Sequence, residues 1–179
     1  SITEMRPGVI RYRGYSIADL IGRVSFIDMV WLMTRGDLPS PAQSALLDAA
    51  LMSAVDHGPA APSLAIARMA ATCGIGLNGA MASAVNVLGD IHGGAGEQAM
   101  ALYLDVRARQ QSGMPADAAT ASAVDDCIAA NGKSIPGFGH RFHPVDPRSG
   151  PLMGLVEQAA AQGMVEGGFV AIARNIEGL

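Results

Sequence analysis

The chain has 179 residues, of which half are apolar and only 4% are aromatic. Its apolar residues are mostly alanine, leucine, isoleucine, valine and methionine, and with so few aromatics the composition predicts an all-α protein of one compact domain or two small ones. Twelve basic against sixteen acidic residues give a net charge of −4, which provides no electrostatic case for binding nucleic acid.

The first half of the chain predicts a short extended segment followed by helices. Residues 8–15, GVIRYRGY, alternate apolar and polar side chains and predict a short strand or extended turn. A helical pattern begins at Ser16, and Ser25 is expected to be the N-cap of a second helix. A capping box at Ser40 begins a helix that should run to about Asp56. Its inward side chains are expected to be Leu46, Leu47, Leu51 and Val55.

The remainder of the chain predicts further helices and one long loop. The loop covers residues 133–150, where prolines and glycines prevent helix formation. A seam near residues 90–96 separates a very apolar first half from a more polar second half. The helices are expected near residues 63–73, 79–89, 97–111, 115–130, 151–162 and 166–178.

Two features bear on the cellular compartment. Residues 69–89 carry no charge and are long enough to span a bilayer, but their glycines and asparagines break the pattern. We therefore expect two short buried helices and no membrane span. Cys73 and Cys127 are far apart in alanine-rich contexts and are expected to be buried free thiols, which fits a reducing, cytoplasmic location. No N-terminal signal pattern is visible.

Histidines in glycine- and proline-framed segments are the main candidates for chemistry. The chain has four, His57, His92, His140 and His143, and three of them lie in loops or at helix ends. A zinc site is disfavoured because the HxxH pair at 140 and 143 lies in a proline-interrupted loop without further ligands. GIGLNG at residues 74–79 matches a dinucleotide-binding motif but follows no predicted strand, which disfavours dinucleotide binding. No G-x-S-x-G motif is present, so a serine hydrolase is also disfavoured.

The remaining interpretation is acid–base chemistry at a carbonyl group. An imidazole with an ordinary pKa of about 6.5 can donate or accept a proton near neutral pH. One neutral ring can hydrogen-bond a developing enolate oxygen while another polarises an acceptor carbonyl. Arg68, Arg141 and Arg148 could pair with carboxylates. Gly137 and Gly139 leave the backbone open to an extended ligand.

Four segments, in order along the chain, resemble the citrate synthase superfamily, which includes the citryl-CoA lyase module of ATP-citrate lyase. They are residues 8–40, DHGPAAPS at 56–63, HGGAGEQAM at 92–100 and IPGFGHRFHPVDPR at 135–148. The last two are similar to the two catalytic-histidine motifs of the family. The resemblance implies an all-α fold in which a large and a smaller helical domain close over a cleft. On this pattern residues 1–91 belong to the large domain and residues 92–179 form the small one.

The resemblance also implies the chemistry. Acetyl-CoA would be deprotonated to its enol and added to a 2-oxo dicarboxylate such as oxaloacetate, with the CoA thioester as a substrate and no metal or permanently bound cofactor. His92 would hydrogen-bond the enol, and His140 would polarise and protonate the oxo acid carbonyl. His57 and Arg148 would bind the oxo acid, with Arg68 near its carboxylates. The backbone of Ile135, Pro136, Gly137, Phe138 and Gly139 would contact CoA.

Two alternatives stay open alongside this interpretation. The sequence DHGPA at 56–60 is more similar to the citryl-CoA lyase form of this segment. A lyase would use the same groups to cleave citryl-CoA. The aspartate base of the family normally follows the helix that residues 167–179 begin. The sequence is therefore either truncated there, or it belongs to a non-catalytic homologue that binds CoA or a dicarboxylate. A homodimer is implied by the resemblance.

Overall fold

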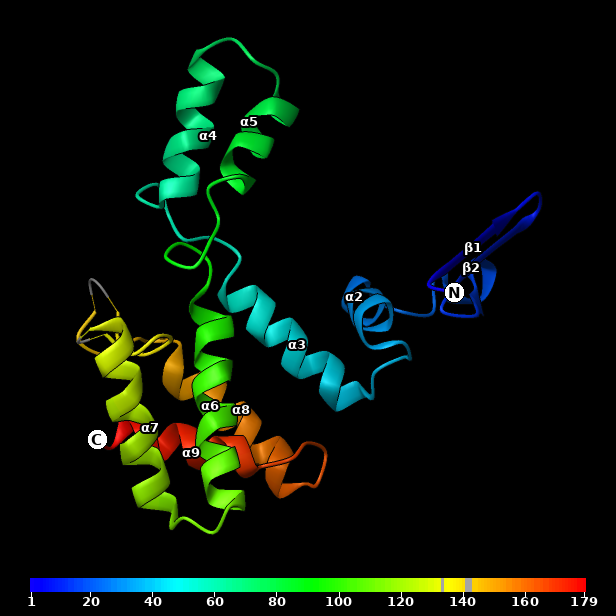
Figure 1. Ribbon diagram of the computed structural model, residues 1–179. Helices are drawn as coiled ribbons and strands as arrows, with labels where there is room; N and C mark the ends of the chain where they lie inside the picture. Colours follow the sequence, from blue (N-terminus) through cyan, green and yellow to red (C-terminus); the bar gives the residue numbers. More distant parts are fainter. Residues whose placement is uncertain (133, 141–142) are drawn as a thin grey trace. The chain divides into compact units, whose positions relative to one another are not determined.

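The computed structural model describes residues 1–132, 134–140 and 143–179 (Figure 1). The described residues are mostly helical, with short strands near the N-terminus, and the predicted all-α class is confirmed. The chain divides into two compact units, residues 1–55 with 152–166, and residues 56–151 with 167–179. The predicted boundary between residues 91 and 92 separates the large and small domains that the family resemblance implies. It stays a prediction.

A small antiparallel sheet begins the first unit. Strand β1 (Thr3–Arg6) pairs with β2 (Val9–Tyr12), which pairs in turn with β3 (Tyr15–Ser16). The turn between β2 and β3 has positive φ at both Arg13 and Gly14, as a two-residue hairpin of this kind requires. The predicted short strand is therefore confirmed. The sequence did not indicate β1, because TEMR shows no alternation of its own and becomes a strand by pairing with β2.

Helices in the first unit begin at the capping residues that the sequence indicated. Ser25 accepts a hydrogen bond from the Asp28 N–H, and the Asp28 carboxylate accepts one from the Ser25 N–H. Ser40 and Gln43 form the same reciprocal pair. Both pairs satisfy backbone donors that a helix start leaves unbonded. The helices are α1 (Ile17–Leu20), α2 (Phe26–Arg35) and α3 (Pro41–Ser53).

The end of α3 departs from the prediction. The helix stops at Ser53, because the next two N–H groups bond to carbonyls three residues back and tighten the last turn. Leu46 and Leu47 are half-buried, whereas Leu51 is 45% and Val55 84% exposed. The predicted inward placement of the latter two is therefore wrong. Val55 lies beyond the helix, and the residues of α3 that face α2 lie in its N-terminal half.

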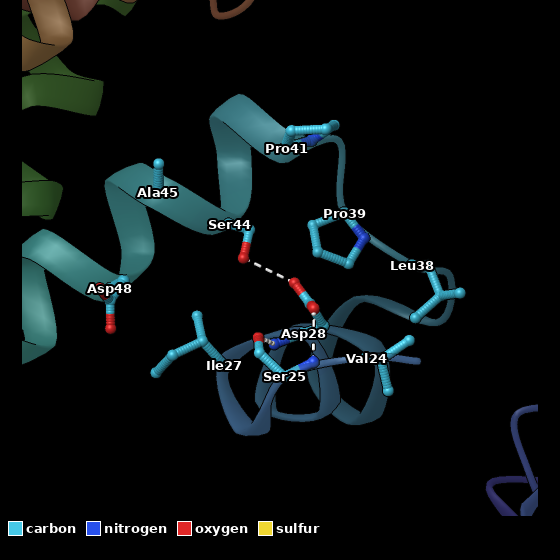
Figure 2. Close-up of a pocket in the computed structure, with 10 residues that line it drawn as sticks. All are labelled: Val24, Ser25, Ile27, Asp28, Leu38, Pro39, Pro41, Ser44, Ala45 and Asp48. Carbon is cyan, nitrogen blue, oxygen red and sulfur yellow. Dashed lines mark hydrogen bonds between the residues drawn. The ribbon is translucent and has the colours of Figure 1, made fainter. Parts of the chain in front are cut away.

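Asp28 connects α2 to α3 (Figure 2). Besides capping α2, it accepts a hydrogen bond of 2.6 Å from the Ser44 hydroxyl on α3. This bond, followed by those from Ser25, favours the charged carboxylate and lowers the pKa of Asp28. The carboxylate lies beside a hollow of about 540 Å³ between the two helices. A single side chain thus caps the start of α2 and bonds it to α3.

The second unit contains a hydrophobic core made by three helices. In this unit α6 and α7 pack side by side, and α9 packs against both. Arg109 connects α6 to α7. Its guanidinium donates to Asp105 on α6 and to Ser122 and Asp126 on α7. The helices are α6 (Ala95–Gln111), α7 (Ala116–Asn131) and α9 (Gly168–Glu177). The core residues are Leu102, Val106, Ala119, Ala123, Val124, Ile172 and Ile176.

The other helices of the second unit leave much apolar surface exposed. Helices α4 (Pro62–Thr72) and α5 (Leu77–Val85) pack against each other as a hairpin in which only Ala80 is buried. Helix α8 (Ser149–Ala161) begins in this unit and continues into the first. The exposed apolar side chains of the hairpin are Leu64, Met69, Ile75, Leu77, Met81 and Val85.

The cysteines correct one expectation. Both are free thiols, but Cys73 is exposed and Cys127 only half-buried. Cys73 follows the last residue of α4 and points back at the Met69 carbonyl, so the helix end leaves it at the surface. The predicted burial of both thiols is therefore wrong, and the cytoplasmic location stays a prediction. Across the described residues, no helix combines the length and hydropathy that crossing a bilayer requires.

The capping box of α2 gives a stability prediction. Replacing Ser25 by alanine removes the hydroxyl that accepts from the Asp28 N–H. We expect the free energy of unfolding in urea to fall by about 1 kcal/mol. Ser16→Ala is the matched control, because Ser16 precedes α1 without a side-chain capping bond. An equal loss in both variants would contradict the assignment.

Candidate functional site

His92 lies in a tight turn between α5 and α6. Its carbonyl oxygen accepts a hydrogen bond of 3.0 Å from the Gly89 N–H, and Gly93 has a φ of +116°. A Cβ at Gly94 would lie 2.7 Å from the carbonyl oxygen of Asp90, so this position requires glycine. The glycines of the HGG sequence therefore fold the turn that holds His92 just before α6.

The start of α4 holds the His92 imidazole. Its Nε2 lies 3.2 Å from the backbone nitrogen of Ser63 and 3.0 Å from the Ser63 hydroxyl. A backbone N–H can only donate, so Nε2 is the acceptor nitrogen of a neutral ring. The proton of that ring is then on Nδ1. In its neutral form the His92 imidazole therefore has Nδ1–H as its donor.

The second predicted catalytic histidine, His140, is exposed and held in the opposite sense. Its Nδ1 accepts a hydrogen bond of 3.2 Å from the backbone N–H of His143. By the same argument, the proton of a neutral His140 is on Nε2. The rings of His140 and His143 lie 4.5 Å apart between centroids. Backbone amides thus orient both predicted catalytic histidines and select a different donor nitrogen in each.

The glycine-rich segment before His140 is anchored in the core of the second unit. Ile135 and Phe138 pack against this core, and the Phe138 N–H donates to the Ile135 carbonyl at 3.1 Å, closing a turn. The ring of Phe138 meets that of Tyr103 edge-on, with centroids 6.2 Å apart. The side chains of this segment therefore fix the position of its backbone.

Gly137 brings this segment against α6. A Cβ at Gly137 would lie 2.7 Å from the Cβ of Ala99 and 3.7 Å from the carbonyl oxygen of Ala95. Both residues belong to the first turns of α6, the helix that begins just after the His92 turn. The two histidine motifs therefore meet at the N-terminal end of the same helix. The need for glycine at 137 follows from this packing, whatever ligand the segment contacts.

Arg148 is paired with a neighbouring carboxylate. Its Nε and Nη2 donate to the two oxygens of Asp146 at 2.9 and 2.7 Å, and its backbone N–H donates to Oδ1 at 2.9 Å. These bonds from Arg148 hold the pKa of the Asp146 carboxyl well below its usual range, and they raise the pKa of Arg148. The charge of His140 lowers the pKa of Asp146 further. His140, His143, Asp146 and Arg148 form one group, which we call the His140 cluster.

The other predicted substrate ligands lie outside these contacts. His57 is exposed in the segment before α4, and Arg68 is exposed on α4 itself. In the described part of the chain, neither side chain forms a hydrogen bond or ion pair. Arg141 lies outside the described residues. Among residues 1–132, 134–140 and 143–179, no three His, Cys, Asp or Glu side chains are grouped to hold a metal ion.

The sequence did not indicate the residues that orient the predicted site residues. Asp146 had a usable signal, because the string Asp-Pro-Arg places a carboxylate two residues from Arg148. Ser63 had none, since its contact with His92 joins positions 29 residues apart through the packing of α4. The missed residues are therefore the partners of the predicted ones, and most act through backbone groups that a sequence does not mark.

The tautomer of His92 gives a test by NMR with ¹⁵N-labelled histidine. We expect a protonated Nδ1 and an unprotonated Nε2 in the wild type and in Ser63→Ala, which keeps the backbone N–H. Ser63→Pro removes that N–H at a first-turn position where proline is tolerated, and the preference should be lost. Protonation of Nε2 in the neutral wild-type ring would contradict the assignment.

Comparison with known proteins identifies the family of this chain. The family model of the citrate synthase C-terminal domain matches residues 1–46 and 38–179. Citrate synthase of Deinococcus radiodurans is 31% identical over 145 residues, which is 80% of this chain and 35% of that protein. The solved citryl-CoA lyase of Hydrogenobacter thermophilus is 32% identical with a TM-score of 0.79, over 98% of this chain and 64% of that one.

A more distant structure shares the fold alone. ATP citrate lyase of Methanothrix soehngenii, in complex with citrate and coenzyme A, is 20% identical with a TM-score of 0.78, over 99% of this chain and 27% of that one. The chain spans about a third of the curated citrate synthases that it matches, 32% of one and 35% of another. Because the family model matches all 179 residues and the fold agrees, the chain belongs to the citrate synthase superfamily.

Proposed function

We propose that the protein condenses acetyl-CoA with oxaloacetate or a similar 2-oxo acid through an enol intermediate. The observation that carries the proposal is the pair of backbone-held histidines. His92 lies in the turn that leads into α6, and His140 follows Gly137, which packs against the first turns of the same helix. A positioned N–H donor stabilises an oxygen on which negative charge develops, and a second can polarise the acceptor carbonyl. Holding both rings by backbone amides lowers the reorganisation needed during reaction.

Each histidine serves one reactant in this proposal. The Nδ1–H of His92 hydrogen-bonds the thioester oxygen of acetyl-CoA while a base, an aspartate by resemblance to the family, removes a methyl proton. The enol carbon then attacks the 2-oxo carbon of oxaloacetate, and the Nε2–H of His140 protonates the resulting alkoxide. Hydrolysis of the citryl-CoA thioester by water releases citrate and the free CoA thiol.

The residues proposed to bind the two substrates belong to the same unit as the histidines. We propose that Arg148 and His57 bind the oxo acid, with Arg68 supplying a further positive charge near its carboxylates. The backbone of residues 135–139 is proposed to contact CoA. This role suits a segment whose Ile135 and Phe138 side chains are fixed in the core. CoA enters as a substrate, and the proposal needs no resident cofactor.

The same groups can also run the reaction in reverse. In cleavage of citryl-CoA, His140 would accept the proton of the citryl hydroxyl, and His92 would stabilise the acetyl-CoA enol that leaves. The similarity to the Hydrogenobacter thermophilus citryl-CoA lyase supports this second candidate. The two candidates differ in the preferred direction, which an assay with each substrate set resolves.

Removing either imidazole tests the proposal. We expect His92→Ala and His140→Ala to lower kcat by about 10²- to 10⁴-fold, the range for a positioned acid–base group. The measurement is release of free thiol by the full-length protein from acetyl-CoA and oxaloacetate, with citryl-CoA cleavage in parallel. His143→Ala is the control, because it keeps the backbone N–H that orients His140.

The wild-type protein decides between the enzymatic and the non-catalytic interpretations. If it neither releases thiol with oxaloacetate or related 2-oxo acids nor cleaves citryl-CoA, the enzymatic proposal is wrong. Binding of CoA and citrate without turnover would then support the non-catalytic homologue.

We also propose that the protein forms a homodimer through the α4–α5 hairpin. This hairpin exposes many large apolar side chains while burying only Ala80, and exposed apolar surface of this extent is typical of protein interfaces. The family resemblance implies that the covering surface is a second copy of the chain. Two such hairpins would bury apolar faces of the same kind against each other.

A charge on the hairpin tests the proposed dimer. Met81 is 59% exposed on α5, and Met81→Glu would place an unpaired carboxylate in the interface. Because such burial costs several kcal/mol, we expect the dimer Kd to rise by at least about 100-fold. Sedimentation velocity at micromolar concentration measures it. Met5→Glu, at a 70% exposed site on β1, should change nothing. A wild-type monomer would contradict the proposal.

A further inference from the structure

We propose that Gln98 is a positioning residue for His92, because its side-chain amide bonds the turn that carries His92 to the start of α6. The inference rests on the proposed function, in which the Nδ1–H of His92 must meet the thioester oxygen. Gln98 acts through His92 and needs no contact with the substrate.

The bond that carries this inference joins Gln98 to the residue two positions before His92. The Gln98 Nε2 donates to the Asp90 carbonyl oxygen at 2.9 Å, although the two residues are eight positions apart. Gln98 lies in the first turn of α6, where its backbone N–H donates to the Gly94 carbonyl at 3.0 Å. The side-chain bond therefore runs from a residue fixed in a regular helix to a residue of an irregular turn.

Close packing and a second hydrogen bond hold the turn at the same place. A Cβ at Gly94 would lie 2.7 Å from the Asp90 carbonyl oxygen and 2.8 Å from its Cα, so the Asp90 backbone lies directly against the helix start. On the other side, the Gly89 N–H donates to the His92 carbonyl at 3.0 Å. The backbone of His92 is therefore held between the Gly89 bond and the Gln98 bond.

The position of this backbone decides where the imidazole donor points. The ring accepts the Ser63 N–H at Nε2, at 3.2 Å, so its other end is aimed by the turn that carries it. If the turn shifts, either the Nδ1–H moves or the Ser63 contact breaks. A displacement of about 1 Å at a reacting group can cost about 100-fold in rate. An uncharged amide donor suits this role, because its bond does not depend on protonation.

The Gln98 side chain also borders the second histidine motif. It lines a hollow of about 250 Å³ together with Pro136 of that motif and with Cys127 and Asn131 of α7. The space in this hollow admits other rotamers of a flexible side chain, and the bond to Asp90 selects one of them. A substitution that removes only the donor therefore leaves the packing of α6 in place.

Gln98→Met removes the amide donor and keeps an unbranched side chain that favours helix. In the full-length protein we expect kcat for thiol release from acetyl-CoA and oxaloacetate to fall about 10- to 100-fold. The KM for oxaloacetate should stay within about twofold of wild type, because its proposed ligands are other residues. Gln111→Met is the matched control, since Gln111 is exposed at the opposite end of α6 and its kcat should be unchanged. An unchanged kcat in Gln98→Met would overturn the proposal.

A double variant separates positioning from general destabilisation. If Gln98 acts only through His92, then Gln98→Met should cause no further loss of kcat in a His92→Ala background. A further loss comparable to the loss in the wild-type background would overturn the proposal, because the amide would then act by another route.

Hydrogen exchange without substrate tests the same bond independently of activity. We expect the Gly89 amide to exchange at least about tenfold faster in Gln98→Met than in wild type, while the amide of Val106 in the core keeps its protection. Equal exchange of Gly89 in the two proteins would overturn the proposal. If the difference is present but the wild type turns over no substrate, the proposed function fails and the positioning of His92 stands.

A measurement on the wild type needs no variant to fold. Because Gln98 donates to the Asp90 carbonyl, its side-chain amide protons should exchange with solvent more slowly than those of the exposed Gln111. Equal exchange of the two side-chain amides would show that the Gln98 bond does not persist in solution, and would overturn the proposal.

Discussion

A backbone N–H can donate a hydrogen bond but never accept one, and the proposed chemistry depends on this one-way property. The amides of Ser63 and His143 bond to ring nitrogens of His92 and His140 and so fix which nitrogen carries the proton in each neutral ring. A side-chain partner could rotate or titrate. A backbone amide does neither, so the two donors are set when the chain folds.

Helix α6 is the element at which the two histidine motifs meet. The His92 turn leads directly into it, and Gly137 of the second motif lies against Ala99 in its second turn. The opposite end of α6 is fastened to α7 by Arg109, and its buried face forms the core with α7 and α9. The site is thus carried by the most firmly packed helices of the second unit, which suits groups that must keep fixed positions.

Local signals in the sequence predicted the helices well where a cap or a break defines the boundary. Ser25 and Ser40 mark helix starts because each bonds within three residues. Prediction failed where the outcome depends on what packs nearby. Strand β1 exists through its partner β2, and the alanine-rich context of Cys73 suggested burial although the end of α4 leaves it exposed. Hydrophobic patterning shows which side chains could be buried, but the partner surface determines which of them are.

For the candidate site, the sequence by itself determined the family and indicated the proposed reactive groups and the glycines around them, because these depend on residue identity and order. It also placed Asp146 beside Arg148, since that pair closes over two residues. Only the tertiary structure decided the donor nitrogen of His92 and the meeting of both histidine motifs on α6. Those features join residues far apart in the chain through backbone groups, and every residue type carries the same amide and carbonyl, so no sequence pattern distinguishes them.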